Sequence, residues 1–166
     1  MQKTEIFIAD PYNKNHIELY KEFEKENGLD EYASNYLTDI SSKYNENDFH
    51  RLFKNKNENK TFLFLVSNNK ISDTCLINYE KDRKTSTITF PTLEKQYRKI
   101  VDVSVAYSFK VLKSEEILST VNENDKAIQK SLHNNGFESL GKEKDNIVFV
   151  KEKPIIKETE GTKIWR

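Results

Sequence analysis

The amino-acid sequence predicts an α+β fold with a mixed, largely antiparallel central sheet and helices on both faces. Three features support this prediction. Short apolar runs separated by polar turns fill the middle of the chain, which is typical of an antiparallel meander. Segments with helical spacing then separate the later strands, so this part of the sheet requires helical crossovers. Further helical segments precede the meander.

The first part of the chain predicts one strand followed by helices. The apolar run Glu5–Ala9 ends at Asp10-Pro11, which indicates a strand. Helical spacing of apolar residues predicts helices over Asn15–Glu26 and Asp30–Tyr44. A run of capping residues then predicts a short helix around Phe49–Phe53.

The remainder of the chain predicts six strands and two helices. The strands are identified by apolar or β-branched runs bounded by polar turns. The first helix is identified by apolar residues near one face, and the second by the Asn-Gly pair that stops it. The expected strands are Thr61–Ser67, Ile71–Tyr79, Thr85–Phe90, Glu116–Val121, Phe137–Leu140 and Asn146–Lys151. The expected helices are Gln96–Leu112 and Asn124–Asn134.

Length and composition indicate one folded domain. The 166 residues suit a single domain, which we place at residues 1–153, with residues 154–166 as a polar tail. Hydrophobic residues make up 36% of the chain, and its 10 Phe and 8 Tyr add large apolar areas to a core. A folded domain is therefore expected rather than a disordered chain.

Charge and cysteine content argue against several kinds of partner and site. Lys+Arg and Asp+Glu are equal at 27 each and are interspersed, so we expect no nucleic-acid partner. The one cysteine, Cys75, cannot form a disulfide or a Cys-based metal site within the chain, and we expect no metal. Neither a signal region nor an apolar run near the ~20 residues of a membrane helix is visible, so we expect a cytoplasmic protein without a membrane partner.

The segment from Asn124 to Phe137, NDKAIQKSLHNNGF, is the most specific motif in the chain. Asn124 can cap a helix, because its side chain can accept hydrogen bonds from the first backbone N–H groups. Gly136 permits the left-handed turn that ends a helix, and Phe137 begins the next strand and packs beneath it. An ordinary Asn-capped helix with a glycine stop would give the same pattern.

Together with the order of the strands, this segment resembles the GNAT acetyltransferase superfamily. The resemblance covers roughly Thr61–Lys151. It implies an N-acyltransferase that moves an acetyl group from acetyl-CoA, its co-substrate, to an amine acceptor of unknown identity. It also implies that the Asn124 side chain reaches the pantetheine arm.

The resemblance places the pyrophosphate loop at Tyr97–Val103, where the family has two glycines at a helix N-terminus. Those glycine positions fall on Val101 and Val103, whose β-branched side chains stand where phosphate would approach. Asp102 adds an unfavourable charge, whereas Arg98 and Lys99 can bind phosphate directly. The same residues would also fit the exposed first turn of an ordinary helix. The predicted cofactor-binding residues are Leu93, Arg98, Lys99, Ile100, Val101, Asp102, Val103 and Asn124.

The catalytic groups of the family have no clear equivalents in this sequence. The strand end that would bind the thioester carbonyl contains Pro91, which has no N–H to donate. Ser86, Thr87 and Thr89 replace a strand carboxylate, and Leu132 replaces a tyrosine acid, so no catalytic residue is assigned. His133 is a weak acid-base candidate, because the resemblance places it near the acyl site.

Two functions therefore remain open from the sequence. One is an N-acetyltransferase, in which proximity and orientation supply much of the rate. The other is a GNAT-like module without catalysis that binds a protein or another ligand. A homodimer built through the last strands or the tail is compatible with both.

Overall fold

The structure is a computed structural model that describes residues 4–9, 13–27, 60–91, 93 and 98–154. The strands are β1 (Thr4–Ile8), β2 (Lys60–Ser67), β3 (Lys70–Glu80), β4 (Thr85–Thr89), β5 (Glu116–Asn122), β6 (Glu138–Glu143) and β7 (Asn146–Glu152). The helices are α1 (Lys14–Asn27), α4 (Lys99–Ala106), the π-helical turn η1 (Tyr107–Val111) and α5 (Lys126–Asn134). The helices predicted over Asp30–Tyr44 and around Phe49–Phe53, and the tail from residue 155, lie outside the described residues.

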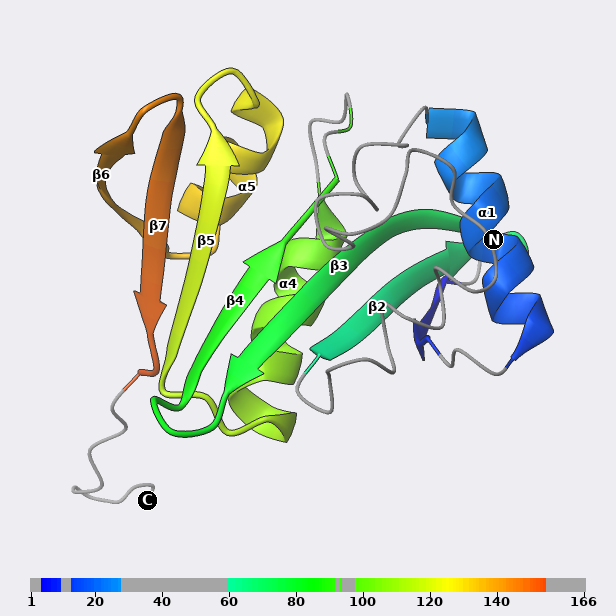
Figure 1. The fold of residues 1–166 in the computed structure, drawn as a ribbon, viewed down its shortest axis with the longest axis horizontal. Helices are drawn as coiled ribbons and strands as arrows, with labels where there is room; N and C mark the ends of the chain where they lie inside the picture. Colours follow the sequence, from blue (N-terminus) through cyan, green and yellow to red (C-terminus); the bar gives the residue numbers. More distant parts are fainter. Residues whose placement is uncertain (1–3, 10–12, 28–59, 92, 94–97, 155–166) are drawn as a thin grey trace.

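The strands form one mixed sheet in the order β1-β2-β3-β4-β5-β7-β6 (Figure 1). Neighbouring strands pair in antiparallel fashion except β4 and β5, which are parallel. The chain joins β4 to β5 through α4 and η1, because parallel neighbours need a crossover connection. The predicted α+β fold with a largely antiparallel sheet is confirmed.

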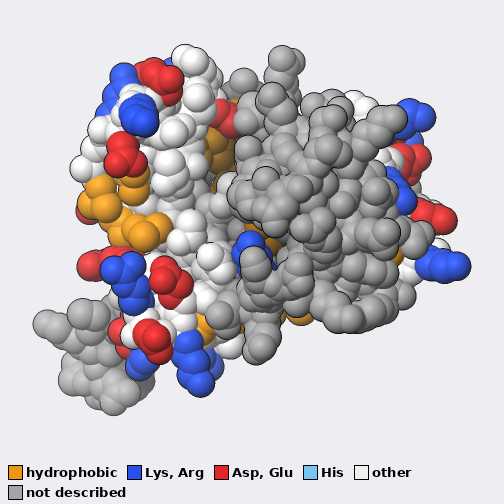
Figure 2. All heavy atoms as spheres, in the orientation of Figure 1, with side chains coloured by type: hydrophobic (Ala, Val, Ile, Leu, Met, Phe, Trp, Pro, Cys, Tyr) orange, Lys and Arg blue, Asp and Glu red, His pale blue; other side chains and the backbone are white. Residues whose placement is uncertain are grey.

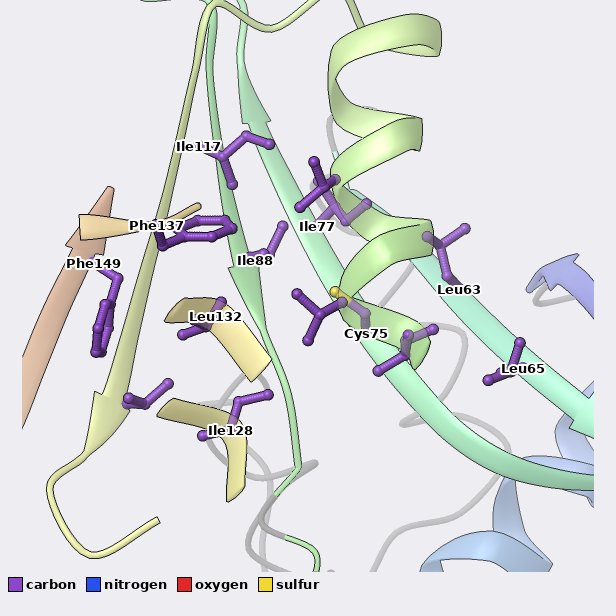
Figure 3. Close-up of a cluster of buried hydrophobic side chains, with 14 residues drawn as sticks. Leu63, Leu65, Cys75, Ile77, Ile88, Ile117, Ile128, Leu132, Phe137 and Phe149 are labelled. Carbon is purple, nitrogen blue, oxygen red and sulfur yellow. The ribbon is translucent and has the colours of Figure 1, made fainter. Parts of the chain in front are cut away.

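Side chains alternate between two apolar clusters on opposite faces of the sheet. Phe62 and Phe64 of β2 pack with Tyr20 of α1, and the Tyr20 and Phe64 rings stack with centroids 5.8 Å apart. Leu63 and Leu65 of the same strand belong to the second cluster, which α4 and α5 cover. Figure 3 shows this second cluster, in which side chains from the strands meet those of the helices. Helices therefore cover both faces, as predicted.

The motif segment folds largely as predicted, with one correction at its start. Gly136 has a φ of +90°, which a residue with a side chain rarely adopts, and the buried Phe137 follows it. The prediction that Asn124 caps the helix is wrong. The N-cap of α5 is Asp125, whose side chain accepts a hydrogen bond from the Ile128 N–H at 3.3 Å.

The crossover helix is also shorter than predicted. The helix expected over Gln96–Leu112 is described as α4 from Lys99 to Ala106, and the chain then widens into the π-helical η1. No described helix is both long enough and apolar enough to cross a membrane.

The leucines of this region give a matched stability test. Leu132 of α5 is fully buried, whereas Leu140 of β6 is 64% exposed. Leu132→Ala should lower the free energy of unfolding by about 2–5 kcal/mol, because it leaves a cavity in the core. Leu140→Ala should change it by less than about 0.5 kcal/mol. Urea unfolding followed by circular dichroism measures both, and equal losses would contradict the assignment of Leu132 to the core.

Candidate functional site

The parallel contact between β4 and β5 is short, and the two strands separate beyond it. Residues 85–87 of β4 pair with residues 116–118 of β5, and no further ladder pair joins these strands. The Ser119 hydroxyl then donates to the Ile88 carbonyl oxygen at 2.9 Å, so a side chain replaces the backbone ladder. Figure 1 shows the strands diverging toward their carboxyl ends. Beyond the ladder, the facing backbone groups of the two strands do not pair with each other.

Two helices begin after these strand ends. Helix α4 begins at Lys99, downstream of β4, and α5 begins at Lys126, directly downstream of β5. Helix N-termini carry partial positive charge and unpaired N–H groups, which favour phosphate. The Asp125 side chain already caps α5, whereas α4 has no side-chain cap, so the start of α4 is the one suited to an anion.

The residue before α4, Arg98, is buried and forms an ion pair with Asp73 of β3. Its Nε donates to Asp73 Oδ2 at 2.7 Å and its Nη2 donates to Asp73 Oδ1 at 2.8 Å. The two side chains are 0% and 3% exposed. The guanidinium carbon lies 5.6 Å from the centre of the Phe90 ring, just beyond β4. The third guanidinium nitrogen, Nη1, is buried without a hydrogen-bond partner among the described residues.

Tyr97 of the predicted phosphate loop lies outside the described residues, and residues 99–103 lie on different sides of α4. Ile100 and Val101 are fully buried in the second cluster, so their side chains do not stand where phosphate would approach. Lys99 and Asp102 are exposed, and Asp102 accepts a hydrogen bond from the Asn135 side-chain amide. Val103 is half-buried. Helical backbone therefore occupies the place where the family pattern has a glycine loop.

The other two predicted cofactor-binding residues lie apart from this turn. Leu93 is buried in the cluster beneath α1, on the opposite face from α4. Asn124 is exposed in the turn between β5 and α5, and its N–H donates to the Asn122 side-chain oxygen at 2.8 Å. Asn124 therefore sits at the carboxyl end of β5, beside the divergence.

The carboxylates that directly follow β5 are already engaged: Glu123 pairs with Lys142 Nζ at 2.5 Å, and Asp125 caps α5. Ser86 is buried, and its hydroxyl lies 2.5 Å from the Ser114 hydroxyl. Thr87 and Thr89 are half-buried, and His133 is exposed near the end of α5. No group of His, Cys, Asp and Glu in the described part of the chain could hold a metal ion.

Cys75 is a core residue rather than a nucleophile. It is fully buried in the second cluster, and burial raises the pKa of its thiol well above the usual range. Its sulfur therefore stays protonated at neutral pH, and a protonated thiol is a poor nucleophile.

The sequence prediction missed Asp73. It lies in the apolar run of β3, on the same face of the strand as Cys75 and Ile77, which α4 and α5 cover. Period-two alternation places its carboxylate in the core, and a buried carboxylate needs a cationic partner. That signal was present in the sequence, although it could not identify Arg98 as the partner.

Two surface cavities of about 490 Å³ each lie elsewhere. One is lined by residues of β1 and α1 that include Glu5, Glu18 and Glu22, and this acidic lining disfavours an anionic cofactor. The other adjoins the amino ends of β4 and β5, opposite the divergence. Figure 2 shows acidic and basic side chains interspersed over β5, β6 and β7 on the visible face. Neither of these two cavities is lined by residues at the carboxyl ends of β4 and β5.

Comparison with known proteins supports the fold. No protein-family model and no curated protein matches the sequence. Among solved structures, the Campylobacter jejuni N-acetyltransferase PseH in complex with acetyl coenzyme A is similar at a TM-score of 0.65 and 15% identity, over 92% of this chain and 100% of that chain. The PaiA N-acetyltransferase from Thermoplasma acidophilum in complex with coenzyme A has a TM-score of 0.61 and 14% identity, over 91% and 99% of the two chains. The chain therefore has the GNAT acetyltransferase fold.

The buried thiol predicts a pH dependence of stability. The folded-state pKa of Cys75 is raised, so its contribution to stability is complete below the unfolded thiol pKa of about 8.5 and decreases above it. The free energy of unfolding should fall by up to about 1.4 kcal/mol per pH unit in that range. Cys75→Ala should lack this component.

Urea unfolding of wild type and Cys75→Ala between about pH 7 and 10 measures the difference in stability, with other titrating groups common to both. The free energy of unfolding of wild type should decrease relative to that of Cys75→Ala as the pH rises. A constant difference would show that the native thiol ionises as readily as the unfolded one.

Proposed function

We propose that the protein is an N-acyltransferase that moves an acetyl group from acetyl-CoA to an amine. The observation that carries this proposal is the divergence of β4 and β5 beside the start of α4, in a chain with the GNAT fold. Two solved structures of similar fold contain acetyl coenzyme A or coenzyme A. A separated strand pair suits the extended, amide-containing pantetheine arm, because the facing strand edges carry backbone donors and acceptors.

The residues at the site fit an acyl-CoA in three respects. The first turn of α4 supplies a helix N-terminus for the diphosphate, and the exposed Lys99 adds a cation at the same point. Asn124, at the carboxyl end of β5, supplies an amide for the pantetheine arm. Buried Val101 packs into the core, so the absence of glycine there does not itself block phosphate.

The chemistry assigned to the site depends on positioning. A neutral amine attacks the thioester carbonyl carbon, the carbon–sulfur bond breaks, and the amine proton leaves while coenzyme A departs as its thiol. Glu123 and Asp125, the described carboxylates directly after β5, are engaged by Lys142 and by the start of α5, so water is the proposed proton acceptor. Holding the two reactants in contact supplies a large part of the rate in such reactions.

Isothermal titration calorimetry with acetyl-CoA tests binding, and release of the coenzyme A thiol in the presence of amines tests transfer. Peptide, polyamine and aminoglycoside amines form the acceptor panel. Binding with amine-dependent thiol release supports the proposal. Binding without release from any amine would favour a GNAT-like binding module, and no binding at millimolar acetyl-CoA would exclude the acyl-CoA site.

A charge reversal at the start of α4 gives a sharper test. Lys99→Glu should weaken acetyl-CoA binding by about 10-fold or more, because it replaces a phosphate-binding cation by an anion. Lys153→Glu is the matched control, since Lys153 is exposed at the opposite end of β5. Calorimetry measures both affinities. Equal effects of the two substitutions would contradict placement of the diphosphate at α4.

A further inference from the structure

The Asp73–Arg98 pair occupies an unusual place for two charges. It is the described ion pair in which both side chains are almost completely buried, and it joins the middle of the sheet to the residue before α4. Packing alone does not require it, because apolar residues of similar volume often replace a buried ion pair without loss of stability. The direction that the pair gives to Arg98 is therefore the property that an apolar replacement would lose.

The hydrogen bonds of Arg98 leave one edge of the guanidinium unused. Nε and Nη2 lie on one edge of the planar group and both bind Asp73, so Nη1 points away from the carboxylate. Nη1 has no described partner although it is buried, and an unpaired buried donor is destabilising. Such a donor is well suited to an acceptor brought by a ligand.

The backbone of Arg98 connects this group to the helix start. The Arg98 carbonyl accepts a hydrogen bond from the Val101 N–H at 3.0 Å, which closes the first turn of α4. Fixing the Arg98 side chain on β3 therefore also fixes the position of the helix N-terminus relative to the sheet.

We propose that Asp73 is a positioning residue for acyl-CoA. It orients Arg98 so that Nη1 and the first N–H groups of α4 act together on the diphosphate oxygens, in place of a glycine loop. In a site shielded from water, a charge-assisted hydrogen bond from Nη1 is stronger than one at the surface. This inference rests on the proposed function.

The test compares three proteins by calorimetry with acetyl-CoA and by thermal unfolding. Asp73→Asn keeps the shape of the side chain and removes its charge. The double variant Asp73→Leu/Arg98→Met replaces the pair by apolar side chains of similar size and should restore the melting temperature. Glu115→Gln, which breaks the exposed contact between Lys84 and Glu115, is the control for loss of an ion pair.

Asp73→Asn and the double variant should each bind acetyl-CoA about 10- to 100-fold more weakly than wild type. S-acetylpantetheine, which lacks the diphosphate, should bind all the proteins within about 3-fold when titrated by NMR. If the double variant melts like wild type but loses acetyl-CoA affinity, the loss comes from the missing positioning of Arg98 and not from unfolding.

Two results would overturn the inference, and they are distinguishable. If wild type and the double variant bind acetyl-CoA equally well, the pair has no positioning role while the proposed function stands. If wild type does not bind acetyl-CoA, the proposed function fails and this inference fails with it.

Discussion

The short parallel ladder between β4 and β5 is the constraint on which the rest of the structure depends. It joins two antiparallel parts of the sheet, β1 to β4 and β5 to β6, which are otherwise connected through their packing against the helices. Because the ladder ends after Thr87 and Leu118, the sheet stays continuous at one end and opens at the other. Beyond this limit, the Ser119 hydroxyl still donates a hydrogen bond to the Ile88 carbonyl oxygen.

The placement of α4 follows from two kinds of contact. Ile100 and Val101 anchor the helix in the apolar cluster, and this contact is non-directional. The paired hydrogen bonds between Arg98 and Asp73 add direction, because a planar guanidinium matches a carboxylate in one geometry. Burial therefore holds the helix against the sheet, whereas the ion pair fixes where its first turn lies. The proposed diphosphate site depends on a helix start fixed in this way.

Much of the fold could be predicted from local patterns, whereas the candidate site could not. Apolar runs bounded by polar turns identify β2 and β3, and the Asn-Gly stop after Asn134 identifies α5, within a residue or two. Capping was predicted less well, because Asn124 and Asp125 are adjacent and both can cap, and the backbone decides between them. The Asp73–Arg98 contact joins residues 25 positions apart, so neither local spacing nor composition specifies it. The burial of the Val101 side chain could not be predicted either, because it depends on the residue at which α4 begins.

Acyl-CoA is proposed to bind where β4 and β5 diverge. Hydrogen–deuterium exchange with and without saturating acetyl-CoA tests this claim directly, because a ligand along strand edges and a helix start protects the amides there. The predicted result is slower exchange at the carboxyl ends of β4 and β5 and in the first turns of α4 and α5, with β1 and α1 unchanged. Protection confined to the acidic cavity of β1 and α1, or no protection at the divergence, would contradict it.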